Sequence, residues 1–218
     1  MAPPHAPSNP HWREDRKFVV SELYGEGIDI DTNLYDDGED LTLVPCHNDP
    51  PCPRCGCGAR HLGTAFVAID GACKGNGTAD TRAGVGVYFG RDSEFNITSS
   101  LNIEFPTSQK AELHACSVAL HQIRNVKEDY EPMLSQVVIK ADSEYVVKGM
   151  TEWIFKWEEN GFRTSKGSPV VNAELFRQVE EKIVDLNASG VEVLFWHVPR
   201  ARNKEADAWA NMFGNPYA

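Results

Sequence analysis

The feature that most constrains the fold is an almost continuous apolar run at residues 136–142, Gln-Val-Val-Ile-Lys-Ala-Asp, which ends in an acid. A strand of this kind has no polar face, so it is typical of a parallel sheet that is covered on both sides. Alternating or β-branched runs predict further strands at residues 64–70, 84–90 and 96–105 before it, and at residues 191–198 after it.

Helical periodicity fills the intervals between these strands. Residues 107–125 place Leu113, Cys116, Leu120 and Ile123 on one stripe, which predicts a buried helix face. Residues 143–157 indicate one or two short helices, residues 172–187 a second amphipathic helix, and residues 203–213 a last helix capped by Asn203. The order predicts an α/β fold, with a five-stranded mixed sheet of three antiparallel strands plus parallel strands and helices on both faces.

The length of 218 residues favours one domain with an appended segment. Residues 1–63 are acidic and rich in Pro, Gly and Cys, and we expect an extension with little core of its own and short strands at residues 18–23 and 41–44. Residues 64–214 form the predicted domain, and residues 215–218 a tail. We expect a monomer.

The net charge of −11 excludes a generally basic surface for nucleic acid, because Lys and Arg supply most non-specific binding to phosphates. Any nucleic acid must be bound by a few placed residues. No apolar run has the length of a membrane span. The first residues lack the apolar core of a secretory signal and the Arg-rich pattern of a transit peptide, so we expect a cytoplasmic or nuclear location.

A cysteine-rich cluster lies in the extension. Cysteine and histidine at short spacing can hold a structural Zn²⁺ in a tetrahedral site, but the spacing is irregular, with a single Cys-x-x-Cys. A group of free thiols is the alternative, and disulfides would require an oxidising compartment. The candidate ligands are Cys46, Cys52, Cys55 and Cys57, with His47 and His61 nearby.

Four acids stand where the predicted fold can gather them. Asp70 and Asp142 end strands, whereas Glu112 and Asp207 lie in the first turns of helices. Ligand sites of α/β sheets lie beyond the carboxyl ends of the strands. Clustered carboxylates repel one another unless a cation neutralises them, and hard oxygen ligands select Mg²⁺ or Mn²⁺. Taken singly, each acid is better explained as a turn, cap or helix-dipole residue than as a metal ligand.

Eight short segments carry a resemblance to a known family. They are residues 70–77 (Asp-Gly-Ala-Cys-Lys-Gly-Asn-Gly), 82–88, 107–115 and 141–143, then 153–157 running into 160–165, and lastly 197–199 with 203–207. Together, and in this order, residues 64–214 resemble type 1 ribonucleases H, especially the eukaryotic ones. Nothing in the extension resembles the hybrid-binding module that some eukaryotic relatives carry.

The resemblance implies a ribonuclease H-like fold and an endonuclease that hydrolyses the RNA strand of RNA·DNA hybrids, leaving a 3′-hydroxyl and a 5′-phosphate. It implies that Asp70, Glu112, Asp142 and Asp207 bind Mg²⁺ or Mn²⁺, with two ions present when substrate is bound. Such ions activate a water and stabilise the leaving oxygen of a phosphodiester.

The resemblance also implies three groups of substrate-binding residues. The first group faces the RNA strand, where 2′-hydroxyl contacts distinguish RNA from DNA, and consists of Cys73, Asn76 and Gln109. The second group touches the DNA strand and consists of Trp157, Thr164 and Ser165. The third group, Thr107 and Asn203, forms the pocket for a phosphate of the DNA strand.

The chain departs from the family in places that bear on substrate binding. The family usually has a flexible loop with a His after the position of Pro199, where this chain has only Arg200, Ala201 and Arg202. We hypothesise that Arg200 or Arg202 contacts the scissile phosphate instead. Phe105 stands where the family tends to have Arg and Ser108 where it tends to have Asn, so we expect modest, salt-sensitive affinity.

Two other functions remain open at this point. One is a catalytically weak or inactive module that binds nucleic acid or protein, in which the short loop and acidic surface mark lost affinity for hybrids. The other is a nuclease of the same superfamily with another substrate. Retention of all four acids favours an enzyme, because a module without catalysis has no physical reason to keep mutually repelling carboxylates.

Overall fold

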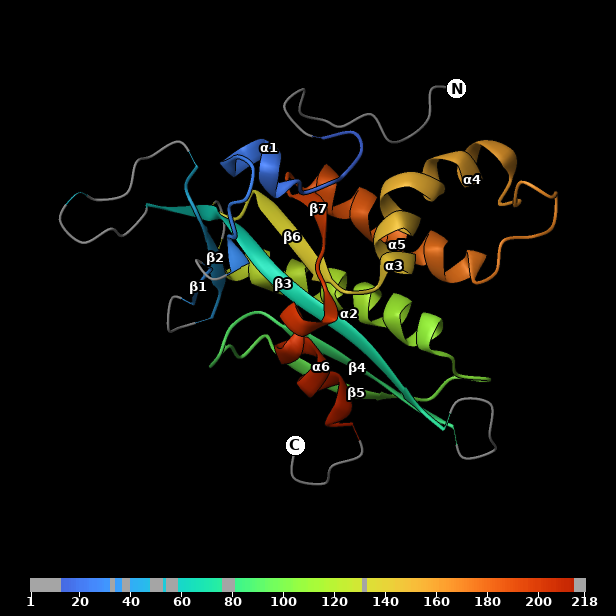
Figure 1. Ribbon diagram of the computed structural model, residues 1–218. Helices are drawn as coiled ribbons and strands as arrows, with labels where there is room; N and C mark the ends of the chain where they lie inside the picture. The colour runs from blue at the N-terminus through green and yellow to red at the C-terminus, as the bar shows by residue number, and fades with distance from the viewer. Residues whose placement is uncertain are drawn as a thin grey trace.

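A computed structural model describes residues 13–31, 34–36, 40–47, 53, 59–75, 81–130 and 133–213. Figure 1 shows the order of the elements. The extension and first strands are α1 (Val20–Tyr24), β1 (Tyr35–Asp36), β2 (Thr42–Pro45), β3 (Arg60–Lys74), β4 (Arg82–Tyr88) and β5 (Ile97–Leu101). There follow α2 (Ser108–Asp129), β6 (Gln136–Ala141), α3 (Glu144–Lys148), a π-helical turn (Gly149–Trp153), α4 (Ile154–Asn160), α5 (Ala173–Ala188), β7 (Glu192–His197), a 3-10 turn (Arg200–Arg202) and α6 (Lys204–Asn211).

The sheet is mixed, as predicted. β3 is at its centre, with β4 antiparallel and β6 parallel to it. β5 pairs antiparallel with β4, and β7 pairs parallel with β6. The five predicted strands are therefore present in the predicted directions. Strand β6 lies between β3 and β7, as its almost continuous apolar sequence predicts.

The extension adds two strands that the five-stranded prediction left out of this sheet. β3 begins at Arg60, before the predicted start, and its first half pairs antiparallel with β2, which in turn pairs with β1. The second half of β3 pairs with β4 on the same edge, and Thr42 N donates to Phe89 O at 2.7 Å where β2 and β4 meet. The extension thus completes an edge of β3 that β4 is too short to cover.

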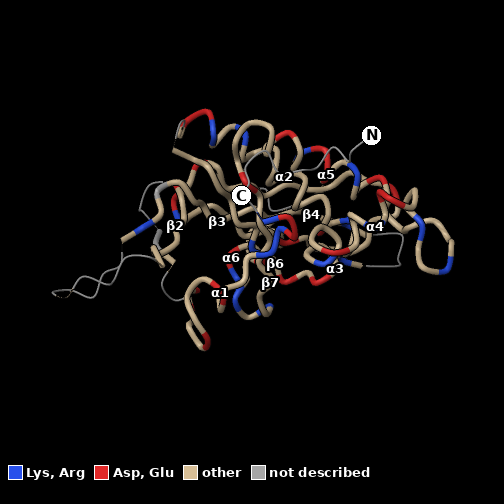
Figure 2. The backbone as a smooth tube through the Cα atoms, turned by 90° about the horizontal axis from the view of Figure 1, so that it is seen from above, with Lys and Arg blue, Asp and Glu red and all other residues tan. Residues whose placement is uncertain are grey.

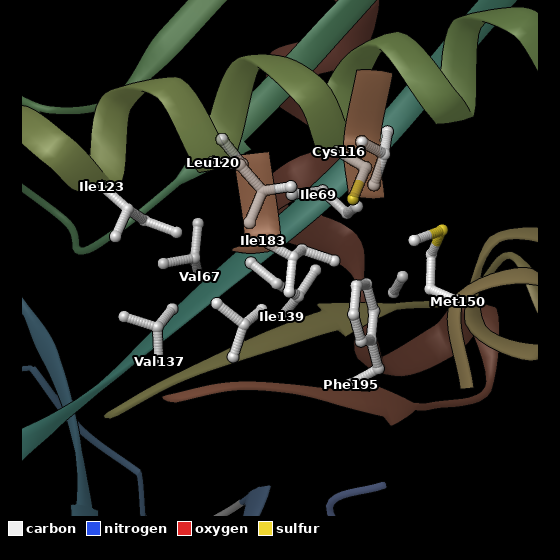
Figure 3. Packing of buried hydrophobic residues seen from close by; sticks show 14 of the residues in the cluster. Val67, Ile69, Cys116, Leu120, Ile123, Val137, Ile139, Met150, Ile183 and Phe195 are labelled. Atoms are coloured by element: carbon white, nitrogen blue, oxygen red, sulfur yellow. The ribbon is translucent and has the colours of Figure 1, made fainter. Parts of the chain in front are cut away.

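Helices cover both faces of the sheet, as Figure 2 shows from above, with α2 and α5 on one side and α6 and α1 on the other. The larger core lies under α2 and α5. In Figure 3, Cys116, Leu120 and Ile123 of α2 point toward Val67 and Ile139 of the sheet, and all five are fully buried. The predicted helical stripe is confirmed.

The second face has a smaller core that the extension helps to build. Phe18, Ile30 and Val44 are buried with Phe66 and Trp196 of the sheet, and the Phe18 ring packs edge-on against both of these aromatic rings. The expectation that the extension contributes little core is wrong, because this face of β3, β6 and β7 is apolar and α6 packs mainly on β3, β4 and β5.

The strand predicted at residues 18–23 is also wrong. Only Lys17 forms a bridge, with Phe195, and the chain then turns into α1. Val20, Leu23 and Tyr24 recur at helical spacing and pack against the second-face core, so a helical turn partly buries all three where a strand would expose one or more. Among the described residues, no helix is both long and apolar enough to cross a bilayer.

Candidate metal centre

Three carboxylates meet where the parallel pairing of β3 with β6 ends. Asp142 directly follows β6, and Glu112 lies in α2. The prediction that Asp70 ends its strand is wrong, because β3 continues to Lys74 by pairing with β4. One oxygen of each carboxylate lies within 4.8 Å of the others. The register pairs Ile69 with Ala141, which places the following residues, Asp70 and Asp142, side by side. The predicted convergence of these three acids is present.

A glycine lets the helix bring Glu112 to this edge. A Cβ atom on Gly71 would lie 2.2 Å from the carbonyl carbon of Ala111 and 2.2 Å from the backbone nitrogen of Glu112, so β3 and α2 approach more closely than any side chain permits. The Gly71 amide hydrogen-bonds to the carboxylates of Asp70 and Glu112 and lowers the pKa of each.

Burial and mutual repulsion nevertheless dominate the electrostatics. Burial, followed by the charges of Asp70 and Asp142, raises the pKa of Glu112 to about 9. Burial, followed by the charges of Asp142 and Asp207, raises the pKa of Asp70 to about 6. Glu112 Oε2 is buried with no hydrogen-bond partner among the described residues. An unpartnered carboxylate oxygen beside two further acids fits a divalent cation, which would satisfy that oxygen and neutralise the group.

Asn203 orients one of the three acids. Its side-chain amide is fully buried and donates to Asp142 Oδ1 at 2.9 Å and to the backbone oxygen of Ile69 at 2.8 Å. The predicted capping role is wrong, because this inward-turned side chain makes no hydrogen bond to the first turn of α6. The phosphate contact that the resemblance implies for Asn203 stays a prediction. In the structure this amide is not exposed, and its hydrogen-bond partners are Asp142 and the backbone of Ile69.

The fourth acid, Asp207, borders the group. It lies in the first turn of α6 and receives a hydrogen bond from Arg200 Nη2 at 2.5 Å. The charge of Asp207 raises the pKa of Asp70, whereas the guanidinium of Arg200 lowers the pKa of Asp70 and Glu112. Arg200 therefore supplies part of the positive charge that the acids require when no cation is bound.

The segment from Arg200 to Arg202 forms a single tight turn between β7 and α6. Arg202 is held by the extension, since its guanidinium donates to both carboxylate oxygens of Asp29 at 2.9 Å and 2.7 Å. Sequence reasoning missed this partner. Asp29 lies far from Arg202 in the chain and in a segment without periodicity, so only the fold reveals the contact.

The residues expected to face the RNA strand lie near the acids along the chain. Gln109 is exposed in the first turn of α2, and Cys73 is half-buried near the end of β3. Asn76 lies outside the described residues. Their contacts with RNA stay a prediction.

The residues expected to meet the DNA strand lie at the start of α2 and around α4. Thr107 is the N-cap of α2, and its hydroxyl oxygen accepts from Lys110 N at 3.2 Å. Thr164 and Ser165 lie in the turn after α4, which Thr164 N closes by donating to Ser168 O at 2.8 Å. Their contacts with DNA stay a prediction too.

Trp157 has a structural role as well as a predicted one. Its ring centroid lies 4.9 Å from that of Phe176 and 5.6 Å from that of Trp153, so it anchors α4 on α5. It is only partly buried, which leaves some of the ring available to a ligand.

The cysteine cluster is described only in part, because Cys52, Cys55 and Cys57 lie outside the described residues. Cys46 N donates to Ala59 O at 2.7 Å where β2 and β3 form a hairpin. The rings of His47 and His61 lie 5.4 Å apart on the two sides of this hairpin. The ends of the cysteine-rich loop are thus close together.

Comparison with known proteins places this site in a family context. The family model described as RNase H matches residues 64–212. Ribonuclease H1 of Mus musculus is 33% identical over 154 residues, which cover 67% of this chain and 49% of that protein. Ribonuclease H of Nitrosomonas eutropha is 35% identical over 150 residues, covering 67% of this chain and 86% of that protein.

A solved structure shows the same fold at lower identity. The foamy viral protease-reverse transcriptase in complex with dsDNA superposes with a TM-score of 0.52 at 21% identity, over 70% of this chain and 94% of that chain. This chain spans about half the length of the mammalian relatives that it matches.

Proposed function

The chain belongs to the RNase H family, and we propose that it hydrolyses the RNA strand of RNA·DNA hybrids with Mg²⁺ or Mn²⁺. The observation that carries this proposal is the convergence of Asp70, Glu112 and Asp142 within 4.8 Å, at the edge of the sheet where sites of this type lie. The relatives named above are ribonucleases H, and they share about a third of their aligned residues with this chain.

Each residue of the site has a proposed task. Asp70, Glu112 and Asp142 would hold the metal, which supplies an activated water and stabilises the leaving oxygen of the phosphodiester. Asn203 holds the Asp142 carboxylate in place. Asp207 would complete the metal site once it separates from Arg200, and the freed guanidinium would then bind the scissile phosphate.

Substrate affinity should depend on a few such contacts. Acidic and basic residues are interspersed along the described chain, and the segment around α4 carries both (Figure 2). With so few uncompensated cations, we expect the affinity for hybrids to be modest and to fall as salt is raised.

A strand-specific cleavage assay tests the proposal. The full chain would be incubated with hybrid, duplex DNA and duplex RNA, each labelled on either strand, with Mg²⁺ or Mn²⁺. We expect cleavage of the hybrid's RNA strand alone, and a loss of about 100-fold or more in Asp142→Asn, because one ligand of the metal supplies several kcal/mol to the transition state. If neither metal supports cleavage, the result would favour the inactive binding module. If duplex DNA is cleaved as well as the hybrid, the result would favour a nuclease with another substrate.

We further propose a structural Zn²⁺ in the hairpin between β2 and β3, with Cys46, Cys52, Cys55 and Cys57 as candidate ligands. The closeness of the His47 and His61 rings across the hairpin supports it. Elemental analysis of the purified chain should give about one zinc per chain, and a Cys46→Ser/Cys55→Ser variant should lose it. A cluster of free thiols would give no zinc and a correspondingly higher thiol titre.

A monomeric state and a cytoplasmic or nuclear location complete the proposal. Light scattering after size exclusion should give the mass of one chain, and a tagged chain should be found in the cytoplasm or nucleus. A dimer mass, or a tag in the secretory pathway, would contradict these two expectations.

A further inference from the structure

The loop between β5 and α2 presents a large apolar side chain to solvent. Phe105 is 83% exposed, more than any other large hydrophobic residue in the described part of the chain. Its backbone has φ 49°, in the left-handed region that non-glycine residues rarely adopt. Neither burial nor an easy backbone conformation accounts for a phenylalanine at this position.

The backbone of this loop is held in place by the first turn of α2. Lys110 Nζ donates to the carbonyl oxygen of Glu104 at 2.8 Å and to that of Phe105 at 3.0 Å. Lys110 N donates to the hydroxyl oxygen of Thr107 at 3.2 Å. Residues fixed in rare backbone conformations cluster at functional sites, so the fixed and exposed position of the Phe105 ring points to a functional role.

The same helix relates Phe105 to the metal centre. Glu112 follows Thr107 by five residues, a rise of about 7.5 Å, and Phe105 lies two residues further from the acids. The two strands of an A-like duplex face each other across a wide, shallow minor groove. This spacing allows the N-terminal end of α2 to lie near the opposite strand when the acids hold a phosphate of the RNA strand.

We propose that the Phe105 ring packs against a deoxyribose of the DNA strand and selects against ribose at that position. The 2′-carbon of deoxyribose is a CH₂ group, which an apolar ring can cover at no cost. A ribose would place its 2′-hydroxyl against the ring, where the hydroxyl loses water and finds no hydrogen-bond partner. This inference rests on the proposed function, and it adds a residue that recognises the strand that is not cut.

Binding measurements on the full chain test this role without relying on cleavage. The Asp142→Asn protein would be titrated with a fluorescent hybrid, and then with hybrids in which a single ribonucleotide is moved stepwise along the DNA strand. We expect affinity to fall about 3- to 10-fold at one or two adjacent positions. Adding Phe105→Ser should weaken binding to the all-DNA strand by a similar factor and abolish the position dependence.

Two further variants separate a ring contact from other effects. Phe105→Arg should restore affinity at low salt through phosphate, with a steeper salt dependence and no discrimination against ribose. Met133→Ala is the matched control, because Met133 is 50% exposed but precedes β6, at the end of the sheet opposite the acids. It should leave the profile unchanged.

The outcomes distinguish this inference from the proposed function. If the wild-type chain cleaves hybrids but Phe105→Ser keeps the same affinity and ribose profile, the Phe105 role is overturned and the proposed function stands. If the Asp142→Asn protein fails to bind any hybrid and the wild type cleaves none, both are overturned.

Discussion

The charged carboxylate of Glu112 destabilises the metal-free protein but favours the binding of a cation. The Glu112 side chain is brought to the site by α2, and burial together with the charges of Asp70 and Asp142 raises its pKa to about 9. Without metal, the folded protein therefore keeps a proton there that the unfolded chain releases near the ordinary pKa of a glutamate. The same unfavourable carboxylate is what makes the pocket a strong site for a cation.

This difference predicts a pH dependence of stability in the presence of a chelator. The folded state binds more protons than the unfolded state between about pH 4.5 and 9, so the free energy of unfolding should decrease as pH rises through this interval. Glu112→Gln should flatten the decrease and stabilise the metal-free protein at pH 8 by about 1–3 kcal/mol. Urea titrations at several pH values measure this. A wild-type stability that rises with pH would contradict the assignment.

Asn203 gives a second prediction at the residue scale. Its buried amide bonds to Asp142 and to the backbone of Ile69, so Asn203→Ala leaves a buried acceptor unpaired and should cost about 2 kcal/mol of stability. Asn211→Ala, which removes an exposed amide from the same helix, should change stability by less than about 0.5 kcal/mol. Thermal unfolding of the two variants compares them. Equal losses would show that the Asn203 amide has no special role.

At the scale of elements, the contact between β3 and α2 decides whether the acids meet. The two backbones touch at Gly71, where a Cβ would lie 2.2 Å from Ala111. Helix α2 can be read from its apolar stripe, but this contact depends on how the helix packs, which periodicity does not specify.

Gly71→Ala should therefore separate Glu112 from Asp70 and cost about 2–3 kcal/mol through overpacking. Gly90→Ala is the control, since the nearest atom to a Cβ there lies at 3.4 Å, and it should cost less than about 1 kcal/mol. Chemical denaturation gives both values, and metal affinity should fall in the Gly71 variant alone. An unchanged metal affinity in Gly71→Ala would contradict this account of the site.

The elements also show what the sequence can and cannot predict. The strand at residues 136–142 and the stripe of α2 were predictable, because a periodic apolar pattern permits few arrangements. Asp142 was predictable as a strand-end residue, and Glu112 and Asp207 as helix-start residues, whereas Asp70 lies within β3 because β4 extends the pairing of this strand beyond β6. The extension was not predictable, since Phe18, Ile30 and Val44 are isolated apolar residues that become a core only against β3, β6 and β7. The inward orientation of the Asn203 side chain could not be predicted either, because its partners, Ile69 and Asp142, lie on or directly after strands far away in the sequence.

At the scale of the whole molecule, the extension is part of the folded unit. Arg16 forms a buried ion pair with Glu180 of α5 at 2.5 Å and 2.7 Å, and Asp29 holds Arg202 beside the site. The extension therefore ties the turn that carries Arg200 to the second face of the sheet.

Loss of one extension side chain should accordingly destabilise the entire protein. Phe18→Ala removes a buried ring from Phe66 and Trp196 and should cost about 3 kcal/mol. Ile28→Ala, at a residue that is 50% exposed, should cost less than about 1 kcal/mol. Each variant should unfold in a single transition. A separate early transition in Phe18→Ala, with the rest of the chain unaffected, would show that the extension is an independent unit.

The shared cation site is tested most directly by calorimetric titration of the metal-free chain with Mn²⁺ at neutral pH. Saturable binding should weaken about 10-fold or more in each of Asp70→Asn, Glu112→Gln and Asp142→Asn, and should stay unchanged in Asp92→Asn, which alters an exposed turn. Equal affinity in all four variants and the wild type would contradict the account, because it would mean that these three acids do not hold a common ion.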